Sequence, residues 1–97
     1  MIGRTDGRSA DELRALGHFP NPATSGASLR FDLRRAVAVR VTLYDVLGRE
    51  VKQLAGGFFR AGSHEVRIDA SELTSGVYTY RLVAGRGTAT RALIVAR

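Results

Sequence analysis

The chain has 97 residues, of which 44% are hydrophobic, and this length and composition encode one domain with a single modest core. No run approaches the roughly 18 apolar residues of a membrane-spanning helix, so membrane insertion is not expected, and the absence of cysteine excludes a disulfide framework and cysteine-based zinc sites. The net charge of +6 comes almost entirely from arginine, a balance also found in proteins that bind nucleic acid or anionic surfaces. Because the arginines are scattered and only Arg34, Arg35 and Arg40 form a local group, we expect a solvated basic surface and no nucleic-acid partner.

The N-terminal stretch, residues 1–12, is polar and is typical of a linker or tail rather than a signal peptide. We expect the domain to comprise residues 13–97. Its first element has two interpretations: Ser9 and Glu12 match the capping box of a short helix, or Leu13–Phe19 forms an edge strand. We favour the strand, because so short a helix is marginal by itself.

A proline-rich corner follows at Pro20-Asn21-Pro22, where two fixed φ angles and two missing donors favour a rigid, extended turn. Ala23–Gly26 is predicted to be a loop. Ala27–Leu33 alternates between apolar and polar residues and is predicted to be a strand with Leu29, Phe31 and Leu33 facing inward.

The longest alternating pattern runs from Val37 to Tyr44. Its aliphatic residues share one parity and its polar residues share the other, which is typical of a half-buried strand. The aliphatic parity, predicted to face the core, comprises Val37, Val39, Val41 and Leu43.

Asp45-Val46-Leu47-Gly48 breaks this alternation. Aspartate can accept hydrogen bonds from the backbone two residues on, and glycine accepts a positive φ, so these four residues predict a tight turn ending in a glycine bulge. A second strand over Glu50–Ala55, with Val51 and Leu54 as its apolar residues, would complete a β-hairpin.

Two adjacent phenylalanines, Phe58 and Phe59, come next in a predicted loop bounded by Gly56-Gly57 and Ala61-Gly62. We expect at least one of them to cap the core, and the alternative is a contact patch for a partner. Ser63–Asp69 is the next predicted strand, in which His64 is expected to be a satisfied histidine rather than a ligand.

The remaining chain predicts a crossing loop over 70–76, a strand over 77–84, a turn at Gly85-Arg86-Gly87 and a last strand over 88–96. A leucine in the crossing loop, followed by a tyrosine, predicts that a tyrosine hydroxyl bonds back to the loop backbone. Six strands and a possible seventh, spaced at ~8–12 residues, indicate an all-β fold, an antiparallel β-sandwich. Its buried residues are expected to include Phe31, Val41, Leu43, Val66, Ile68, Tyr80 and Leu82.

Residues that carry chemistry are sparse. Ser63 and His64 would point to opposite faces of a strand and cannot act as a nucleophile–base pair. His18 and His64 are the only histidines, no third ligand stands beside them, and the glycines form no phosphate-binding pattern. We therefore expect no catalytic residue, cofactor or metal, and a non-enzymatic role in recognition, targeting or spacing.

Several segments, taken in order, resemble the C-terminal sorting domain of the type IX secretion system, type A. No one segment is specific, whereas the ordered set is, and it covers Leu13–Arg97. The segments are P-N-P at 20–22, L-R-F-D-L at 29–33, V-T-L-Y-D-V-L-G-R-E-V at 41–51, A-G-S-H-E-V at 61–66, D-A-S-E-L-T-S-G-V-Y-T-Y-R-L at 69–82 and T-R-A-L-I-V-A-R at 90–97.

The resemblance implies an immunoglobulin-like sandwich that sorts a cargo protein. In this family the domain directs a periplasmic cargo through the outer-membrane translocon, and a sortase-like protease at the cell surface then removes it. Cleavage is expected near the N-terminal border, in or before residues 4–17. The cargo is expected in the periplasm in transit, and then at the outer membrane or cell surface, or secreted.

The motif residues carried over by position divide into two groups. We expect most of them to determine the fold. We expect a partner to recognise the others, which are the outward-facing Arg81, Arg91 and Arg97, together with the exposed edge of the terminal strand, which offers unpaired backbone groups. The carried-over residues are Pro20, Asn21, Pro22, Tyr44, Asp45, Gly48, Val51, Gly76, Tyr78, Tyr80, Arg81, Leu82 and Arg91–Arg97.

Two departures from the family pattern stand out. Ala23-Thr24-Ser25-Gly26 takes the place of an aromatic residue and a second N-P, and Arg97 takes the place of a frequent terminal lysine. A structural spacer is the alternative hypothesis, since a similar sandwich with related Y-D-x-x-G-R and G-x-Y motifs closes the flagellar hook-capping protein.

Overall fold

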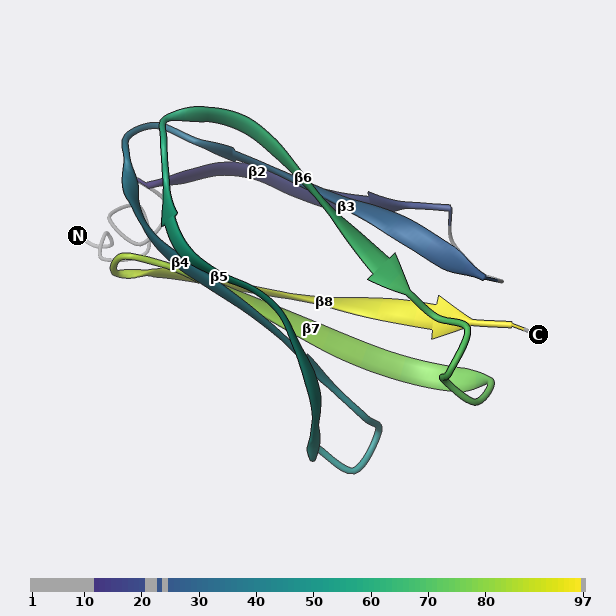
Figure 1. Cartoon of the computed structure of the whole chain (residues 1–97). Coiled ribbons are helices and arrows are strands. Elements are labelled where there is room, and N and C mark those ends of the chain that lie inside the picture. Colours follow the sequence, from purple (N-terminus) through teal and green to yellow (C-terminus); the bar gives the residue numbers. More distant parts are fainter. Residues whose placement is uncertain (1–11, 21–22, 24, 97) are drawn as a thin grey trace.

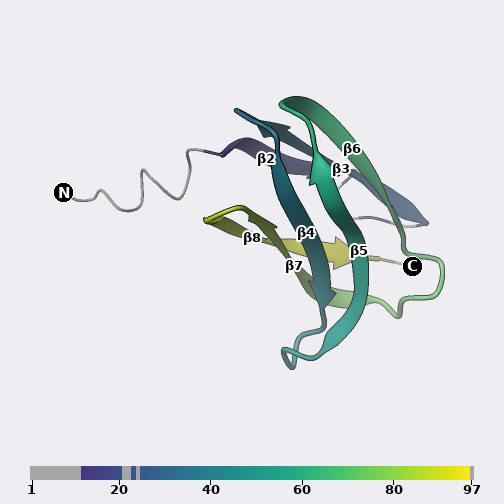
Figure 2. The same ribbon diagram turned by 60° about the vertical axis from the view of Figure 1, so that its left-hand side comes forward.

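Seven strands in two antiparallel sheets make up the described part of the chain, which in this computed structural model is residues 12–20, 23 and 25–96 (Figure 1). One sheet has the order β2-β3-β6 and the other β5-β4-β7-β8, and the two face each other as the layers of an immunoglobulin-like sandwich (Figure 2). The strands are β2 (Leu13–Phe19), β3 (Gly26–Leu33), β4 (Val37–Tyr44), β5 (Glu50–Phe59), β6 (Gly62–Asp69), β7 (Gly76–Ala84) and β8 (Gly87–Val95). The predicted antiparallel sandwich of about seven strands is confirmed. No helix in this part of the chain is long and apolar enough to cross a membrane.

The core lies between the sheets, and the buried apolar residues of β3, β4, β7 and β8 come from one parity of each of these strands, as the alternation predicts. Six of the seven residues expected to be buried are buried, and Val66 is the exception. Val66 is only half-buried because β6 is an edge strand of the three-stranded sheet, with one flank open. The fully buried large side chains are Tyr80, Phe31, Leu29, Leu33, Leu43, Ile68, Leu82, Leu93, Val41 and Val95.

The first element is the strand β2 rather than a helix. It pairs antiparallel with β3, from Leu13 opposite Leu33 to Phe19 opposite Ser28. The hydrogen bonds to β3 stabilise this segment as a strand, whereas a helix this short would be marginal by itself. The Phe19–Pro20 peptide bond is cis, and the strand ends at this point.

Beyond this corner the chain crosses from one sheet to the other at Ala23. The Ala23 N–H donates to the Ile94 carbonyl at 2.8 Å, and the Ala96 N–H donates to the Ala23 carbonyl at 2.8 Å. These bonds form a parallel bridge to the end of β8. Ala23, expected to lie in a loop, is completely buried.

Strand β5 is longer than the sequence predicts, because Gly56 and Gly57 do not end it. The pairing with β4 continues to Phe58 and Phe59, opposite Ala38 and Val37. Glycine disfavours a strand, but ladder bonds to β4 outweigh this preference here.

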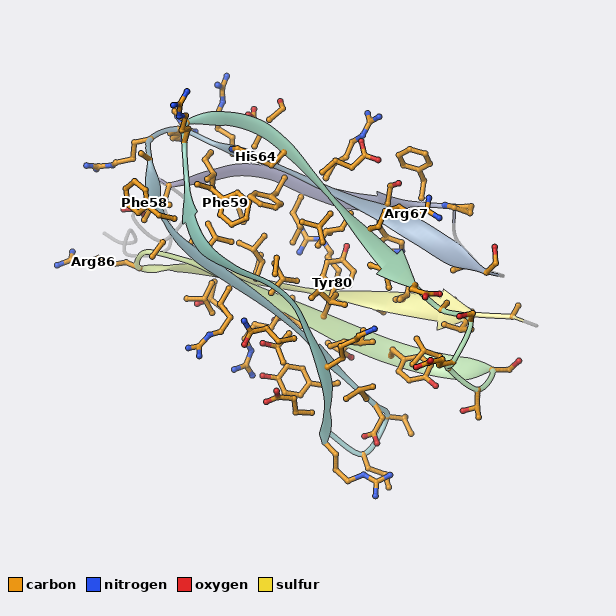
Figure 3. The ribbon with its side chains drawn as sticks, viewed as in Figure 1. Phe58, Phe59, His64, Arg67, Tyr80 and Arg86 are labelled. Carbon is orange, nitrogen blue, oxygen red and sulfur yellow. The ribbon has the colours of Figure 1, made fainter. Side chains whose placement is uncertain are left out.

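The two phenylalanines of β5 have different surroundings (Figure 3). The Phe59 ring packs between the sheets, with its centroid 5.4 Å from that of Phe31 and 5.1 Å from that of His64. Phe58 points to the outer face of its sheet and is 75% exposed. The expectation that at least one phenylalanine caps the core is confirmed for Phe59.

Candidate functional site

The turn between β4 and β5 is held together by Asp45. One carboxylate oxygen, Oδ1, accepts hydrogen bonds from the Leu47 N–H at 2.9 Å and the Arg49 N–H at 3.0 Å, and Oδ2 accepts one from Arg49 Nε at 2.9 Å. The bond from the Arg49 N–H, the largest of these effects, lowers the pKa of Asp45 below its ordinary value. The predicted contact from the aspartate to the backbone two residues on is confirmed.

Gly48 completes this turn with a positive φ of 83°, as the predicted glycine bulge requires. Its N–H donates to the Asp45 carbonyl at 2.9 Å, and the Asp45 N–H donates to the Arg49 carbonyl at 2.9 Å. The rigid turn raises Val46 and Leu47 into solvent, where they are 77% and 73% exposed.

Beside the turn, Arg81 lies over Tyr44. The guanidinium carbon is 5.3 Å from the centre of the tyrosine ring, within the range of a cation–π interaction. Strand β7 brings the two together because it pairs with β4, placing Arg81 opposite Thr42 and Thr79 opposite Tyr44.

A shallow groove of about 250 Å³ is lined by the turn and these two side chains. The groove therefore unites four of the predicted site residues on the outer face of the four-stranded sheet. Its lining comprises Tyr44, Asp45, Val46, Gly48, Thr79, Arg81 and Thr90. No local pattern in the sequence points to Thr79 or Thr90, which reach the groove only through the pairing of β4, β7 and β8.

Tyr78 and Gly76 serve the fold. The Tyr78 hydroxyl donates to the Thr74 carbonyl at 2.8 Å, which confirms the predicted bond from a tyrosine to the crossing loop. The tyrosine is 7% exposed and belongs to the core. Gly76 begins β7 beside it, on the rim of a second groove of about 400 Å³ that also reaches Asp45.

The last strand, β8, is an edge of the four-stranded sheet, as expected. In an antiparallel ladder, the backbone N–H and C=O groups of successive residues point alternately toward the partner strand and away from it. Ile94 bonds outward to Ala23, so Thr88, Thr90 and Ala92, at the same parity, also direct their backbone groups away from β7.

Arg91 does not face outward as predicted. It shares the parity of the buried Leu93 and Val95, and its side chain reaches solvent only because β8 lies at the edge of the sheet. Its guanidinium donates to the Thr90 carbonyl at 3.0 Å and so covers part of the open edge. Of the other predicted site residues, Pro20 is exposed at the end of β2, and Asn21, Pro22 and Arg97 lie outside the described residues.

A polar pair crosses the core between the sheets. His18 Nδ1 and the Tyr80 hydroxyl share a hydrogen bond of 2.7 Å. Burial raises the pKa of Tyr80 to about 12, although the positive charge of Arg91 opposes the shift. The other histidine, His64, is bonded through Nε2 to the Arg60 carbonyl at 2.7 Å, in agreement with its expected role as a satisfied histidine. Within the described ranges, no group of three or more potential ligands among His, Cys, Asp and Glu could hold a metal ion.

Comparison with known proteins identifies the family, and it finds similar folds among solved structures. The family model described as "Secretion system C-terminal sorting domain" matches residues 18–96. A search of curated proteins finds no match. Among solved structures, dimeric latent PorU from Porphyromonas gingivalis is similar, with a TM-score of 0.69 and 23% identity. The similarity covers 84% of this chain but only 9% of the PorU chain, and at this identity it shows the fold alone.

Proposed function

The chain belongs to the secretion system C-terminal sorting domain family and is a sorting domain of type IX secretion; we propose that it directs a periplasmic cargo protein across the outer membrane and is then cleaved off at the cell surface. The observation that carries this proposal is the family match, which runs from the end of β2 to the end of β8 and so takes in nearly the whole sandwich. The family is a non-catalytic signal, and we propose that this member likewise acts by being recognised.

The proposed partners are the outer-membrane translocon and a sortase-like protease. The groove beside the β4–β5 turn is the first surface proposed for the translocon, because Arg81 has no carboxylate partner among the described residues and can pair with one on a partner. The ring of Tyr44 holds the guanidinium in place and thereby reduces the entropy lost on binding.

The open edge of β8 is the second proposed surface. Thr88 and Ala92 offer backbone groups that an extended segment of a partner can pair with, and Thr90 offers its N–H, since its carbonyl is bonded to Arg91. The nine pairs between β7 and β8 show no register shift, so this edge is regular. Strand β5, the opposite edge, is interrupted by two register shifts against β4 and carries the charges of Glu50 and Lys52, features that protect an edge from pairing.

Cleavage is proposed before β2. A protease binds an extended chain whose backbone is free, whereas residues from Leu13 onward are paired with β3. The Glu12 carbonyl also accepts a hydrogen bond, from the Arg34 N–H at 2.8 Å, so we propose cleavage before Glu12, in or before the expected region of residues 4–17.

The test is a fusion of residues 13–97 to the C-terminus of a periplasm-targeted reporter, expressed in a bacterium that carries a compatible type IX machinery. We expect the reporter at the cell surface. Arg81→Gln should reduce export, while Arg67→Gln, which removes an exposed arginine of β6, should leave it unchanged. Equal export of both variants would remove Arg81 from the proposed recognition surface.

A second fusion separates a terminal signal from a spacer. Deleting Leu93–Arg97 would remove two fully buried side chains, Leu93 and Val95, and would disturb the fold itself. Appending a folded domain after Arg97 leaves the sandwich intact and is the cleaner variant. We expect export to fail, and normal export and processing of this fusion would favour the spacer hypothesis instead.

A further inference from the structure

Arginines that are far apart in the sequence gather at one end of the sandwich. The β3–β4 turn carries Arg34 and Arg35, the β5–β6 corner carries Arg60, and the β7–β8 turn carries Arg86. All three connections lie at the same end of the molecule (Figure 1). We call these four residues the arginine end.

Backbone pairing fixes how the three connections meet. Leu33 pairs with Gly62, which places the β3–β4 turn beside the corner that carries Arg60. The Gly85 N–H donates to the Ala38 carbonyl at 3.0 Å, which ties the β7–β8 turn to the start of β4. The clustering therefore follows from the topology and does not depend on side-chain conformation.

The charge of the arginine end is not neutralised within the described residues. The three ion pairs in this part of the chain use Arg14, Arg30 and Arg49. All four arginines of the arginine end are exposed. Of the acidic residues nearby, Asp32 already pairs with Arg14 at 3.8 Å, and Glu12, which lies beside Gly85, is in none of the three ion pairs.

An exposed aromatic side chain adjoins this charge. Phe58 lies opposite Ala38, the residue that binds the β7–β8 turn, and Arg40 is on the same outer face two residues along β4. Figure 3 shows Phe58 and Arg86 at the same end of the sandwich and Arg67 toward the other. Since Phe59 already fills the core, Phe58 is not needed for packing there.

We propose that the arginine end docks on an anionic lipid surface, with the guanidinium groups on lipid phosphates and Phe58 in the head-group layer. Arginine binds phosphate through two parallel hydrogen bonds, and basic clusters are attracted to anionic leaflets. Phenylalanine, like tryptophan and leucine, is typical of the apolar face of segments that lie in the membrane–water interface beside basic residues. Positive charge beside an exposed apolar residue suits a lipid surface, whereas reading duplex nucleic acid needs a helix or β-ribbon that enters a groove. This binding is peripheral and goes beyond the sorting function.

The test uses the full 97-residue chain with phosphatidylcholine vesicles, with and without phosphatidylglycerol. Because the chain has no tryptophan, Phe58→Trp introduces a single emitter at the proposed contact. We expect co-sedimentation with the anionic vesicles only, loss of binding as salt rises, and a blue shift of the tryptophan emission on binding.

A matched pair of double variants tests the location of the contact. Each arginine near an anionic surface contributes about fivefold to partitioning. Arg60→Gln with Arg86→Gln should therefore weaken binding roughly 25-fold. Lys52→Gln with Arg67→Gln removes the same number of charges from residues that flank Asp69, and it should have a much smaller effect.

Any one of four results would overturn the proposal. Equal loss in the two double variants would mean that only net charge matters. An unshifted tryptophan spectrum in vesicle-bound protein would place the contact elsewhere. Tighter binding to duplex DNA than to anionic vesicles, or binding to neither, would exclude a lipid surface as the partner.

Discussion

Replacing Gly48 with alanine isolates the conformational cost of the β4–β5 turn. A Cβ at Gly48 would meet no heavy atom within 4 Å, so the substitution creates no clash. Its cost therefore comes from the φ of +83°, which is unfavourable for an L-residue by roughly 1–2 kcal/mol. Alanine also lowers the entropy of the unfolded chain, which offsets roughly 0.4–1 kcal/mol. We expect a net loss of about 1 kcal/mol, or a fall in Tm of roughly 4–8 °C for a domain of this size.

The measurement is thermal and urea denaturation followed by far-ultraviolet circular dichroism. Gly17→Ala is the matched control, because a Cβ at Gly17 would also have open space around it, but Gly17 lies in β2 without a positive φ. That control should be neutral or slightly stabilising. Gly48→Asn should lose less than Gly48→Ala, since asparagine tolerates a left-handed conformation better. Equal midpoints for Gly48→Ala and the wild type would refute the argument from φ.

Three further perturbations follow from individual contacts. Tyr78→Phe removes the bond to the Thr74 carbonyl and should lower the free energy of unfolding by about 1 kcal/mol in urea titrations, and an unchanged midpoint would show that the bond is not needed. Hydrogen bonds lower the pKa of Asp45 in the folded state, so its stabilising effect is present above its unfolded pKa and is lost as pH falls through the folded value. Asp45→Asn should therefore flatten the dependence of the free energy of unfolding on acid pH, and a pH profile identical to that of the wild type would contradict the role of the carboxylate. Burial raises the pKa of Tyr80 to about 12, so the contribution of this tyrosine to the stability of the fold is complete below its unfolded pKa and is lost as pH rises through the folded value. Titration followed by ultraviolet absorbance should find one tyrosine that ionises late, and this tyrosine should be missing in Tyr80→Phe.

The alternation of apolar and polar residues predicts most of the fold. Apolar residues two apart in Ala27–Leu33 and in Val37–Tyr44 predict both the strands and the faces they bury, because the pleat leaves no other assignment. The prediction fails at positions whose structure depends on pairing with a neighbouring strand. Gly56-Gly57 resembles a loop locally, and only the pairing with β4 shows that the strand continues.

The candidate site was predictable in its local part alone. Asp45 and Gly48 are close in sequence, so their turn could be predicted from residue chemistry. The contact between Arg81 and Tyr44 depends on the register of β7 against β4, which no local pattern fixes. For the same reason the arginines appear scattered in the sequence, although three connections bring four of them to one end.

The bridge at Ala23 affects how the domain responds to a stretching force. Strand β2 begins near one end of the long axis and β8 finishes near the other (Figure 1). Tension applied between Leu13 and Ala96 therefore runs along the strands, and it loads the two bonds of Ala23 in shear. Bonds in shear must yield together, whereas bonds that are peeled open yield one after another. A pull from an attached protein would therefore have to break both bonds of Ala23 at once before it could separate this bridge from the end of β8.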